Sequence, residues 1–568
     1  MCIVAKPAVI VVDPVSTGLH VAREVLARGF QLIVLHSSDA DKPACIANMP
    51  ADVATHAVAE IHHHGTTLSA LPHDHQSVDM DSTLHALKAH VVGGVLAGCE
   101  TGVTLADHLS DRLGLTTNGA SGAVARRNKY AMGECIRNAG LRAVKQCAAT
   151  SWNSIVDFIE HDLKPVPFQV IVKPVESAGG DDVFLCRSMT EVKDAFDHIQ
   201  GHVNQLGMTN MATLVQEYLV GTEYVVDTVT RHGVHKVVAM WEYEKGPAND
   251  APFVYFAVRL VEATSPKHKA IMEYTLKVLD ALHIRHGPAH AEVMWQPHEQ
   301  APCLVEVGAR CHGNGGYFVP TVDRCLGYNQ VRATVDCYFD PTAFASLPPF
   351  PGKLLAHGCE VPLVSYDEGV IETCPGVNAV ASLASFQCAY WSVGVGSRLV
   401  RTIDVFTKPC SVWLLHASKN VMEADVKRLR KLERNRGLWT VQGEAEHAGL
   451  RRLIANVNAP ESNRQGAIPA EYAVNLMQPF GGASASAEAS ARDKQKAEAS
   501  SLDKAHSGMS AQKKADRGDI FYEKLIIFKT SHNRIKENAE SDNKRLSSKD
   551  MSQEVDRGQK AKQIQTVT

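Results

Sequence analysis

The 568-residue chain lacks long apolar segments and paired cysteines. No uninterrupted apolar run approaches the roughly 18 residues that a membrane span needs, and the apolar stretch at 7–12 is too short for the core of a signal peptide. The fourteen cysteines are scattered and form no Cys-x-x-Cys pair, a pattern typical of reduced, buried thiols rather than of a disulfide framework. We therefore expect a cytoplasmic protein that has no membrane partner.

The chain also lacks an excess of either charge and the sequence motifs of several enzyme classes. Its 58 basic and 62 acidic residues give a formal net charge of −4, so no global basic field indicates a nucleic-acid partner. Neither a GxxxxGK[ST] phosphate loop nor a GxSxG nucleophile motif occurs. The composition is ordinary for a globular protein, and the length predicts roughly three to four domains.

The N-terminal region alternates short apolar runs with segments of helical spacing. Residues 8–12, 32–35 and 91–97 have the apolar, β-branched pattern of strands buried on both faces, and residues 18–26 have helical periodicity. This alternation predicts a Rossmann-like α/β domain with a parallel sheet. The first turn, at 13–18, contains no GxGxxG, so we expect no dinucleotide there.

The remaining chain changes in character twice. Residues 150–340 mix amphipathic helices with alternating strands, which predicts an α+β region of one or two subdomains. Residues 350–456 again show short strands, followed by a charged stretch at 423–436 that we interpret as a solvated surface helix. After about residue 458 large hydrophobic residues are too few to offset the entropy of folding, which predicts a disordered tail.

Two stretches carry residues suited to binding phosphate. Lys129 stands where a loop gives way to a run of helical spacing, and Lys173 ends an apolar, strand-like run. A Ser/Gly loop, residues 176–181, follows Lys173 at once. Backbone N–H groups of such a loop can surround phosphate oxygens while the ammonium group offsets their charge. Each stretch taken alone also has a simpler interpretation: Lys129 as a surface lysine, and the loop after Lys173 as an ordinary Gly-rich turn.

Two further stretches carry isolated acids. Residues 215–224 predict a strand edge that can offer backbone groups to an adenine, with Glu223 placed after a turn. Glu292 and Glu306 lie inside apolar, strand-like runs separated by a hairpin-like loop at 296–300, which predicts that they lie on paired strands. Acids in such positions are costly unless they are compensated, and paired carboxylates are the hard oxygen ligands that Mg²⁺ prefers.

In this order the motifs resemble those of the ATP-grasp superfamily, and most of all its carboxylate–amine ligases of the L-amino-acid ligase (bacilysin-synthetase-like) kind. The resemblance rests on Lys129, Lys173-Pro with its Ser/Gly loop, Gln216-Glu217-Tyr-Leu-x-Gly-x-Glu223, His-x-Glu292 and Glu306-x-Gly-x-Arg310. It implies a pre-ATP-grasp domain at 1–115, an ATP-grasp core of two subdomains at 116–345, a C-terminal lobe at 346–457 and the tail at 458–568.

The resemblance implies how this chain would bind ATP. Lys129 and Lys173 would hold the α- and β-phosphates, the 176–180 loop would close over the phosphates, and Glu223 would bind the ribose. Glu217 and Leu219 would contact the adenine. The ATP-binding residues implied in this way are Lys129, Lys173, Glu176, Ser177, Gly179, Gly180, Gln216, Glu217, Tyr218, Leu219 and Glu223.

The resemblance also implies the metal site and the chemistry. Glu292 and Glu306 would bind two Mg²⁺ ions, with Mn²⁺ as a substitute, and Arg310 would stabilise an acyl phosphate and the tetrahedral state that follows it. Gly308 departs from the family's pattern, because many members have asparagine there to supply an amide oxygen to the second metal. His290 stands where some members have arginine, and as a catalytic donor its charge would depend on pH.

These expectations combine into an ATP-dependent carboxylate–amine ligase. A small carboxylic acid, such as an amino acid, would attack the γ-phosphorus of ATP, and an amine would then displace phosphate from the acyl phosphate. The implied partners are these small-molecule substrates and a second copy in a homodimer. Two alternatives stay open: a bicarbonate-activating enzyme similar to biotin carboxylase, although no Met-Lys-Met biotinyl segment is present, and a scaffold that binds ATP without catalysis.

Two other groups of residues have weaker implications. The histidines at 62–64, with His73 and His75, have no regular ligand spacing and no accompanying cysteine pair, so a polar loop is favoured over a zinc site. Trp241, Tyr255, Arg259 and Tyr317 are candidates for lining a substrate pocket.

Overall fold

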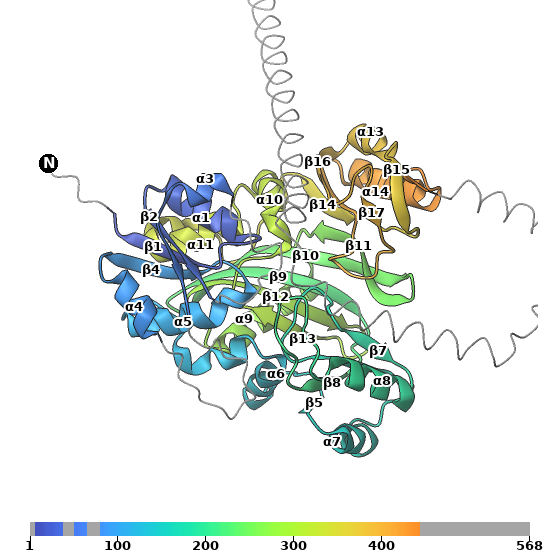
Figure 1. Cartoon of the computed structure of the whole chain (residues 1–568), viewed down its shortest axis with the longest axis horizontal. Coiled ribbons are helices and arrows are strands. Elements are labelled where there is room, and N and C mark those ends of the chain that lie inside the picture. Colours follow the sequence, from blue (N-terminus) through green and yellow to red (C-terminus); the bar gives the residue numbers. More distant parts are fainter. Residues whose placement is uncertain (1–5, 38–49, 65–79, 443–568) are drawn as a thin grey trace, which may run out of the picture. The chain divides into compact units, whose positions relative to one another are not determined.

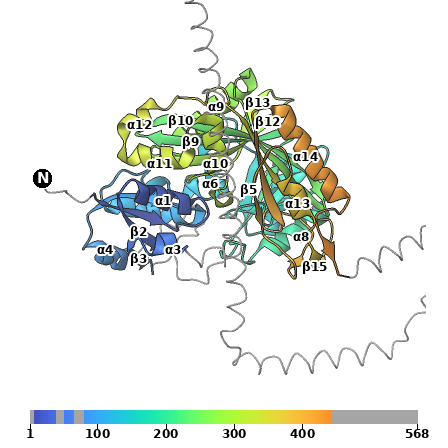
Figure 2. The same cartoon turned by 90° about the horizontal axis from the view of Figure 1, so that it is seen from above.

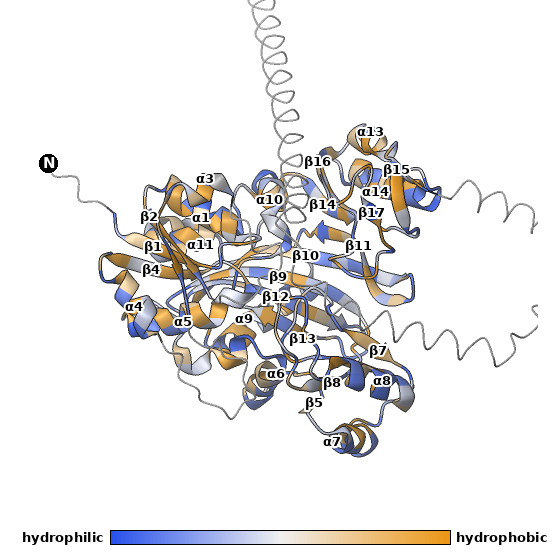
Figure 3. Ribbon diagram, in the orientation of Figure 1, coloured by the Kyte–Doolittle hydropathy of each residue, from blue (hydrophilic) through white to orange (hydrophobic). Residues whose placement is uncertain are grey.

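The N-terminal region folds around a parallel sheet with hydrophobic central strands (Figure 3). The computed structural model describes residues 6–37, 50–64 and 80–442. In sheet order the strands are β3 (Ala57–His62), β2 (Gln31–His36), β1 (Ala8–Val12) and β4 (Val92–Ala97). Helices α1 (Gly18–Ala27) and α11 (Gln330–Phe339) cover one face, and α4 (Asp81–Leu87) and α5 (Val103–Arg112) cover the other (Figure 1). The expected Rossmann-like fold of this region is confirmed.

An antiparallel sheet of eight strands forms the centre of the described chain. One of its faces packs on α6 (Lys129–Asn138) and α9 (Pro266–Ala281) through a core that includes Met132 and Ile271. The opposite face carries the polar side chains that matter for the site. In sheet order the strands are β13 (Ala301–Gly308), β12 (Gly287–Gln296), β9 (Thr222–Arg231), β10 (Val234–Ala248), β11 (Ala251–Leu260), β14 (His357–Pro362), β18 (Cys410–His416) and β16 (Phe386–Trp391).

A smaller antiparallel sheet lies between residues 146 and 217. Helices α7 (Trp152–Asp157) and α8 (Met189–Ile199) pack on one face of this sheet, where Val172 and Val215 are buried. Because side chains alternate along a strand, Lys173 points to the opposite face. In sheet order the strands are β5 (Gln146–Ala149), β8 (Thr213–Glu217), β6 (Val170–Pro174) and β7 (Phe184–Cys186).

The C-terminal part of the described chain adds a third antiparallel sheet, in the order β17 (Arg398–Leu399), β15 (Gly369–Thr373) and β19 (Thr440–Val441). Two helices accompany it, α13 (Gly376–Ala381) and α14 (Lys419–Arg434). The interpretation of the charged helix as a solvated surface helix is wrong for one face of α14. Met422, Val426 and Leu429 are buried in the core there, because their spacing places them on one side of the helix.

Helix α11 connects the parallel sheet to the central sheet. One side of α11 packs beside α1 (Figure 1; Figure 2), and the other side packs on β9 and β10 through Ala333 and Cys337. The remaining α-helices of the described residues are α3 (Ala51–Ala54), α10 (Val319–Leu326) and α12 (Pro341–Ser346). The parallel sheet thus reaches the central sheet through a helix that comes late in the chain.

Several predictions fall outside the described residues. They include the disordered tail at 458–568, the end of the C-terminal lobe at 443–457, and His73 and His75. The domain boundaries near 115 and 345 stay predictions. In the described ranges, no helix is long and apolar enough to cross a membrane.

Candidate active site

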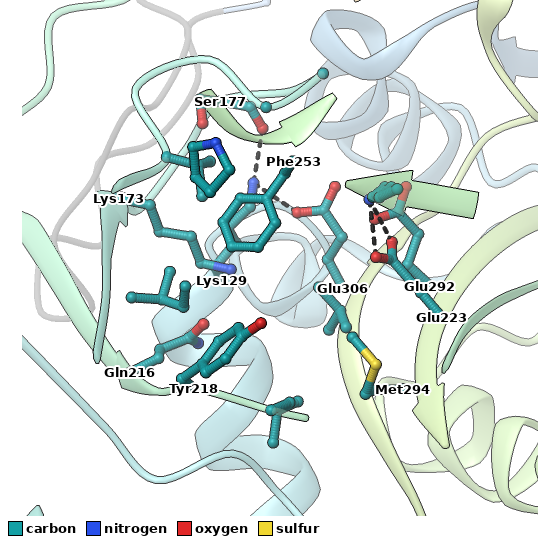
Figure 4. A pocket seen from close by; sticks show the side chains of 18 of the residues that line it. Lys129, Lys173, Ser177, Gln216, Tyr218, Glu223, Phe253, Glu292, Met294 and Glu306 are labelled. Carbon is teal, nitrogen blue, oxygen red and sulfur yellow. Dashed lines mark hydrogen bonds and ion pairs between the residues drawn. The ribbon is translucent and has the colours of Figure 1, made fainter. Parts of the chain in front are cut away.

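A cavity lies between the small and the central antiparallel sheets, and side chains from both of them line it (Figure 4). Three predicted site residues, Glu176, His290 and Arg310, are not among the residues that line the cavity. The other predicted residues all line it: Lys129, Lys173, Ser177, Gly179, Gly180, Gln216, Glu217, Tyr218, Leu219, Glu223, Glu292 and Glu306. The structure therefore brings four distant stretches of sequence to one cavity, while their individual roles stay predictions.

Two lysines reach the cavity from the side of the small sheet. Lys129 is the first residue of α6, whose N-terminus is capped by the Asn128 side chain. Its Nζ donates to the Ser177 carbonyl at 2.6 Å and lies 3.0 Å from a carboxylate oxygen of Glu306. Lys173 comes from β6, and burial lowers its pKa from 10.5 to about 8. The cavity therefore holds two ammonium groups in a poorly hydrated setting, where they would attract phosphate strongly.

The loop that follows Lys173 has the backbone conformation that glycine favours. Gly179 and Gly180 have φ values of 73° and 84°. A Cβ atom on Gly179 would lie 2.7 Å from Cγ2 of Val405 and 3.0 Å from the Phe406 ring. The segment before β18 thus packs against this loop, and its residues Ile403 and Asp404 line the cavity.

The segment between β8 and β9 provides an apolar slot rather than free polar side chains. The Glu217 carboxylate is already engaged, because it accepts from Arg142 at 2.7 Å and from the Lys145 backbone N–H at 2.8 Å. Leu219 is buried in a small apolar cluster, and Tyr218 lies beside Phe253 with the ring centroids 6.3 Å apart. Such flat apolar surfaces with backbone edges suit a planar base.

Three glutamates reach the cavity from the central sheet. Glu292 on β12 and Glu306 on β13 are direct partners in the strand register, as the hairpin interpretation predicts. Glu223 on β9 accepts from Nζ of Lys245 at 2.7 and 2.8 Å (Figure 4). Burial and the neighbouring Glu292 raise the pKa of Glu223 to about 7, whereas His290 and Lys245 lower the pKa of Glu292 despite its burial. The cavity thus concentrates carboxylate oxygens that require cations.

His290 belongs to a buried polar group behind the cavity. Its Nδ1 lies 2.9 Å from Oδ1 of Asp227, and its Nε2 lies 3.6 Å from Oε1 of Glu292. The other carboxylate oxygen of Asp227 lies 3.0 Å from Nδ1 of His312 and accepts from Nε1 of Trp241 at 2.7 Å. Asp227 therefore fixes the His290 ring so that its other nitrogen, Nε2, faces Glu292.

Arg310 is held by an acid from the N-terminal region. Its Nε donates to Oε2 of Glu100 at 2.8 Å, and Arg127 donates to the other Glu100 oxygen at 2.5 Å. Despite burial, Arg310 and Arg127 lower the pKa of Glu100 to about 2. A Cβ atom at Gly308 would lie 2.8 Å from both Glu100 Oε2 and Arg310 Cζ. The glycine that departs from the family's pattern therefore leaves room for the Arg310–Glu100 pair.

Comparison with known proteins agrees with this geometry, since residues 166–316 match the ATP-grasp domain family. The chain carries an ATP-grasp domain. It is 28% identical over 340 residues to the dapdiamide A synthase of Enterobacter agglomerans, covering 60% of this chain and 75% of that synthase. The L-amino acid ligase from Bacillus licheniformis has a similar fold, with a TM-score of 0.57 and 17% identity over 75% of this chain and 98% of the ligase. A carboxyaminoimidazole ribonucleotide synthase from Aspergillus clavatus, solved with ATP, has a TM-score of 0.53 and 14% identity, covering 76% and 99%.

These relatives are synthases and ligases, and the prediction of an ATP-grasp ligase is confirmed. In this ATP-grasp chain, sequence reasoning missed Lys245, Phe253, Ile403 and Asp404, which also line the cavity. Lys245 follows Trp241 and Tyr243 at alternate positions of β10, a signal that places it on the face of the acids. The segment at 403–404 had no such signal, because tertiary folding alone brings it to the cavity.

The four candidates for a substrate pocket separate in the structure. Tyr255 lines the cavity, whereas Trp241 is fully buried beside Asp227. Arg259 is engaged in ion pairs with Glu423 and Glu244, and the Tyr317 ring stacks on Tyr390 outside the cavity lining. Of the four candidates, Tyr255 therefore lies at the cavity, whereas the other three lie outside its lining.

Proposed function

We propose that this ATP-grasp ligase activates a small carboxylic acid as an acyl phosphate and joins it to an amine, with release of ADP and phosphate. The observation that carries the proposal is the cavity in which Lys129 and Lys173 face Glu292 and Glu306. Opposed cations and acids in one buried site suit a polyphosphate bound together with metal ions.

The acids fit the Mg²⁺ ions that such a reaction uses. Glu292 and Glu306 offer oxygen atoms from adjacent strands, with Glu223 nearby, and hard oxygen donors are what Mg²⁺ and Mn²⁺ prefer. Two ions held by these glutamates would offset the charge of the phosphates when bound. The ammonium groups of Lys129 and Lys245, which now neutralise Glu306 and Glu223, indicate how strongly these acids require a cation.

Several residues of the chain have separate roles in the proposed reaction. Lys129 and Lys173 hold the phosphates of ATP, and the loop at 176–180 covers them and excludes water that would hydrolyse an acyl phosphate. The carboxylate of the first substrate attacks the γ-phosphorus, and ADP leaves. The amine of the second substrate attacks the activated carbonyl, and phosphate leaves. Arg310, oriented by Glu100, stabilises the negative charge that develops on the acyl group.

An amino acid is the favoured carboxylic acid. This assignment is supported by relatedness to a dapdiamide A synthase and by a fold similar to that of an L-amino acid ligase. His290, fixed by Asp227 behind the cavity, directs its other ring nitrogen toward Glu292 and so positions this proposed metal ligand.

The test measures the release of phosphate from ATP, in the presence of Mg²⁺, for pairs of the twenty amino acids. Mass spectrometry identifies the products. We expect release that depends on both partners and a product whose mass is that of the two amino acids minus water. Release of phosphate with bicarbonate and no amine would instead identify a bicarbonate-activating enzyme. ATP binding without release on any substrate would identify a scaffold.

A further inference from the structure

Three groups of histidine and carboxylate side chains bring potential metal ligands together in the described residues. They are His36–Glu60–His62, Asp182–His198–His202 and Asp227–His290–His312. The last group is completely buried, and Nε1 of Trp241 already donates a hydrogen bond to its carboxylate. The first lies on β2 and β3, far in sequence from the ATP-grasp domain. The second has two exposed histidines and lies within residues 166–316, directly after the Ser/Gly loop that follows Lys173.

The Asp182 group has a geometry close to that of a metal site. Oδ1 of Asp182 lies 3.0 Å from Nε2 of His198, and Oδ2 lies 3.0 Å from Nδ1 of His202. The three ligand atoms all lie within 4.8 Å of one another. In a tetrahedral Zn²⁺ site with bonds of about 2.0–2.2 Å, ligand atoms are separated by roughly 3.3 Å. Small side-chain movements would therefore bring all three around one ion.

The surroundings orient the three side chains. The Asp182 side chain is only 10% exposed, whereas His198 and His202 are 51% and 47% exposed, so water can complete the coordination. The His198 ring meets the Phe184 ring edge-on with the centroids 5.5 Å apart, which limits its rotation. Asp182 has a φ of 53°, a conformation that Asp tolerates better than most residues. Each imidazole is hydrogen-bonded to one oxygen of the Asp182 carboxylate, which therefore lies between the two rings before any ion binds.

We propose that Asp182, His198 and His202 form a binding site for a divalent transition-metal ion of the Zn²⁺ type. Two imidazoles and one carboxylate are borderline ligands, which favour Zn²⁺, Co²⁺ and Ni²⁺ over Mg²⁺. The site differs from the glutamates of the cavity, whose oxygen donors suit Mg²⁺. Asp182 directly follows the phosphate-covering loop, whereas His198 and His202 lie at and just after the end of α8. An ion bound by all three would therefore attach this loop to α8.

The test is a titration of the full-length, chelator-treated protein with Zn²⁺ in competition with a chromophoric chelator, at neutral pH. We compare the natural protein with His198→Ala–His202→Ala and with His161→Ala–His298→Ala. The second pair removes two exposed imidazoles elsewhere and is the matched control, because the chain has 27 histidines that can bind metal weakly. Far-ultraviolet circular dichroism and a thermal melt establish that each variant is folded.

We expect the natural protein and the control to bind one more equivalent of Zn²⁺ than His198→Ala–His202→Ala, with a dissociation constant at least tenfold lower than that of the remaining sites. Asp182→Asn, which preserves the shape of the side chain, should weaken this equivalent at least tenfold. The visible absorption of bound Co²⁺ should be lost in the same variants. Equal stoichiometry and affinity in all proteins would overturn the proposal. No nucleotide is present, so this outcome is independent of the proposed ligase activity.

Discussion

The two sheets that enclose the cavity bring mainly opposite charges to it; Lys245 on the central sheet and Glu217 on the small sheet are exceptions, and each is already in an ion pair. The small sheet and the start of α6 contribute Lys173 and Lys129, whereas the central sheet contributes Glu223, Glu292 and Glu306. Each set would be costly to bury alone, since unpaired charges lose their hydration. The comparison supports the proposed division of roles, in which the small sheet binds the nucleotide and the central sheet holds the metal ions.

The largest effect on this division of roles is expected when one acid of the central sheet is neutralised. Glu306→Gln keeps the size of the side chain but removes the charge that faces Lys129. We expect kcat to fall by about three orders of magnitude, because several kcal/mol of transition-state stabilisation would be lost. ATP affinity should change much less. The measurements are phosphate release and the equilibrium binding of ATP.

Glu299→Gln is the matched control for that variant. Glu299 is partly exposed, pairs with Arg142 and lies outside the cavity. It should leave kcat within a factor of two of the natural protein. A fully active Glu306→Gln protein would show that Glu306 does not hold a metal.

On the small sheet, Lys173→Ala should act first on ATP binding. The ammonium group is buried in the cavity, and losing a charged hydrogen bond costs about 1.5–3 kcal/mol. The dissociation constant for ATP should therefore rise roughly 10- to 150-fold. Lys193→Ala, on α8 of the same subdomain, removes an exposed lysine and is the control. If Lys173→Ala lowers kcat and leaves ATP affinity unchanged, the assignment of the small sheet to nucleotide binding is wrong.

The same lysine gives the binding side of the cavity a pH dependence. Because burial lowers the pKa of Lys173 to about 8, its ammonium group loses its proton as the pH rises through that value. Between pH 8 and 9.5, where Glu223 with its pKa of about 7 is already ionised, ATP affinity should fall about tenfold. Lys173→Arg stays charged over this range and should bind ATP with a flat profile. Superimposable profiles of the two proteins would contradict the role of Lys173.

Sequence patterns predicted the two charge sets unequally. The acids were placed correctly on paired strands because an isolated Glu in an apolar, strand-like run is a strong local signal, and the loop at 296–300 fixed the pairing of Glu292 with Glu306. Lys129 and Lys173 were found through the Ser/Gly loop and the helix start. Each of these signals is local, so a single sequence carries it.

Contacts that join distant segments were not predictable in this way. Glu100, which holds Arg310, lies 210 residues before it, and nothing near Glu100 distinguishes this residue from a surface acid. Asp227 looks like an ordinary strand residue until the fold places two histidines and a tryptophan around its carboxylate. The charged helix α14 was misjudged because its three buried apolar residues are few, although their spacing defines a face.

The smallest expected effect concerns the loop that covers the small-sheet side of the cavity. Gly179 and Gly180 both have positive φ, so replacing either with alanine adds similar backbone strain of about 1 kcal/mol. Only at position 179 would the new methyl group collide with Val405 and Phe406, since nothing lies within 4 Å of a Cβ at Gly180. We expect kcat/KM for ATP to fall roughly tenfold in Gly179→Ala and only a few-fold in Gly180→Ala.

Adding Val405→Ala to Gly179→Ala tests the origin of that difference. It removes the Cγ2 atom that would lie 2.7 Å from the new methyl group, so part of the lost kcat/KM should return. Val405→Ala alone should have little effect, and the non-additivity of the pair would measure the contact between the loop and the segment before β18. Equal losses in the two glycine variants would mean that strain alone governs the loop. The C-terminal segment would then line the cavity without controlling how the loop closes.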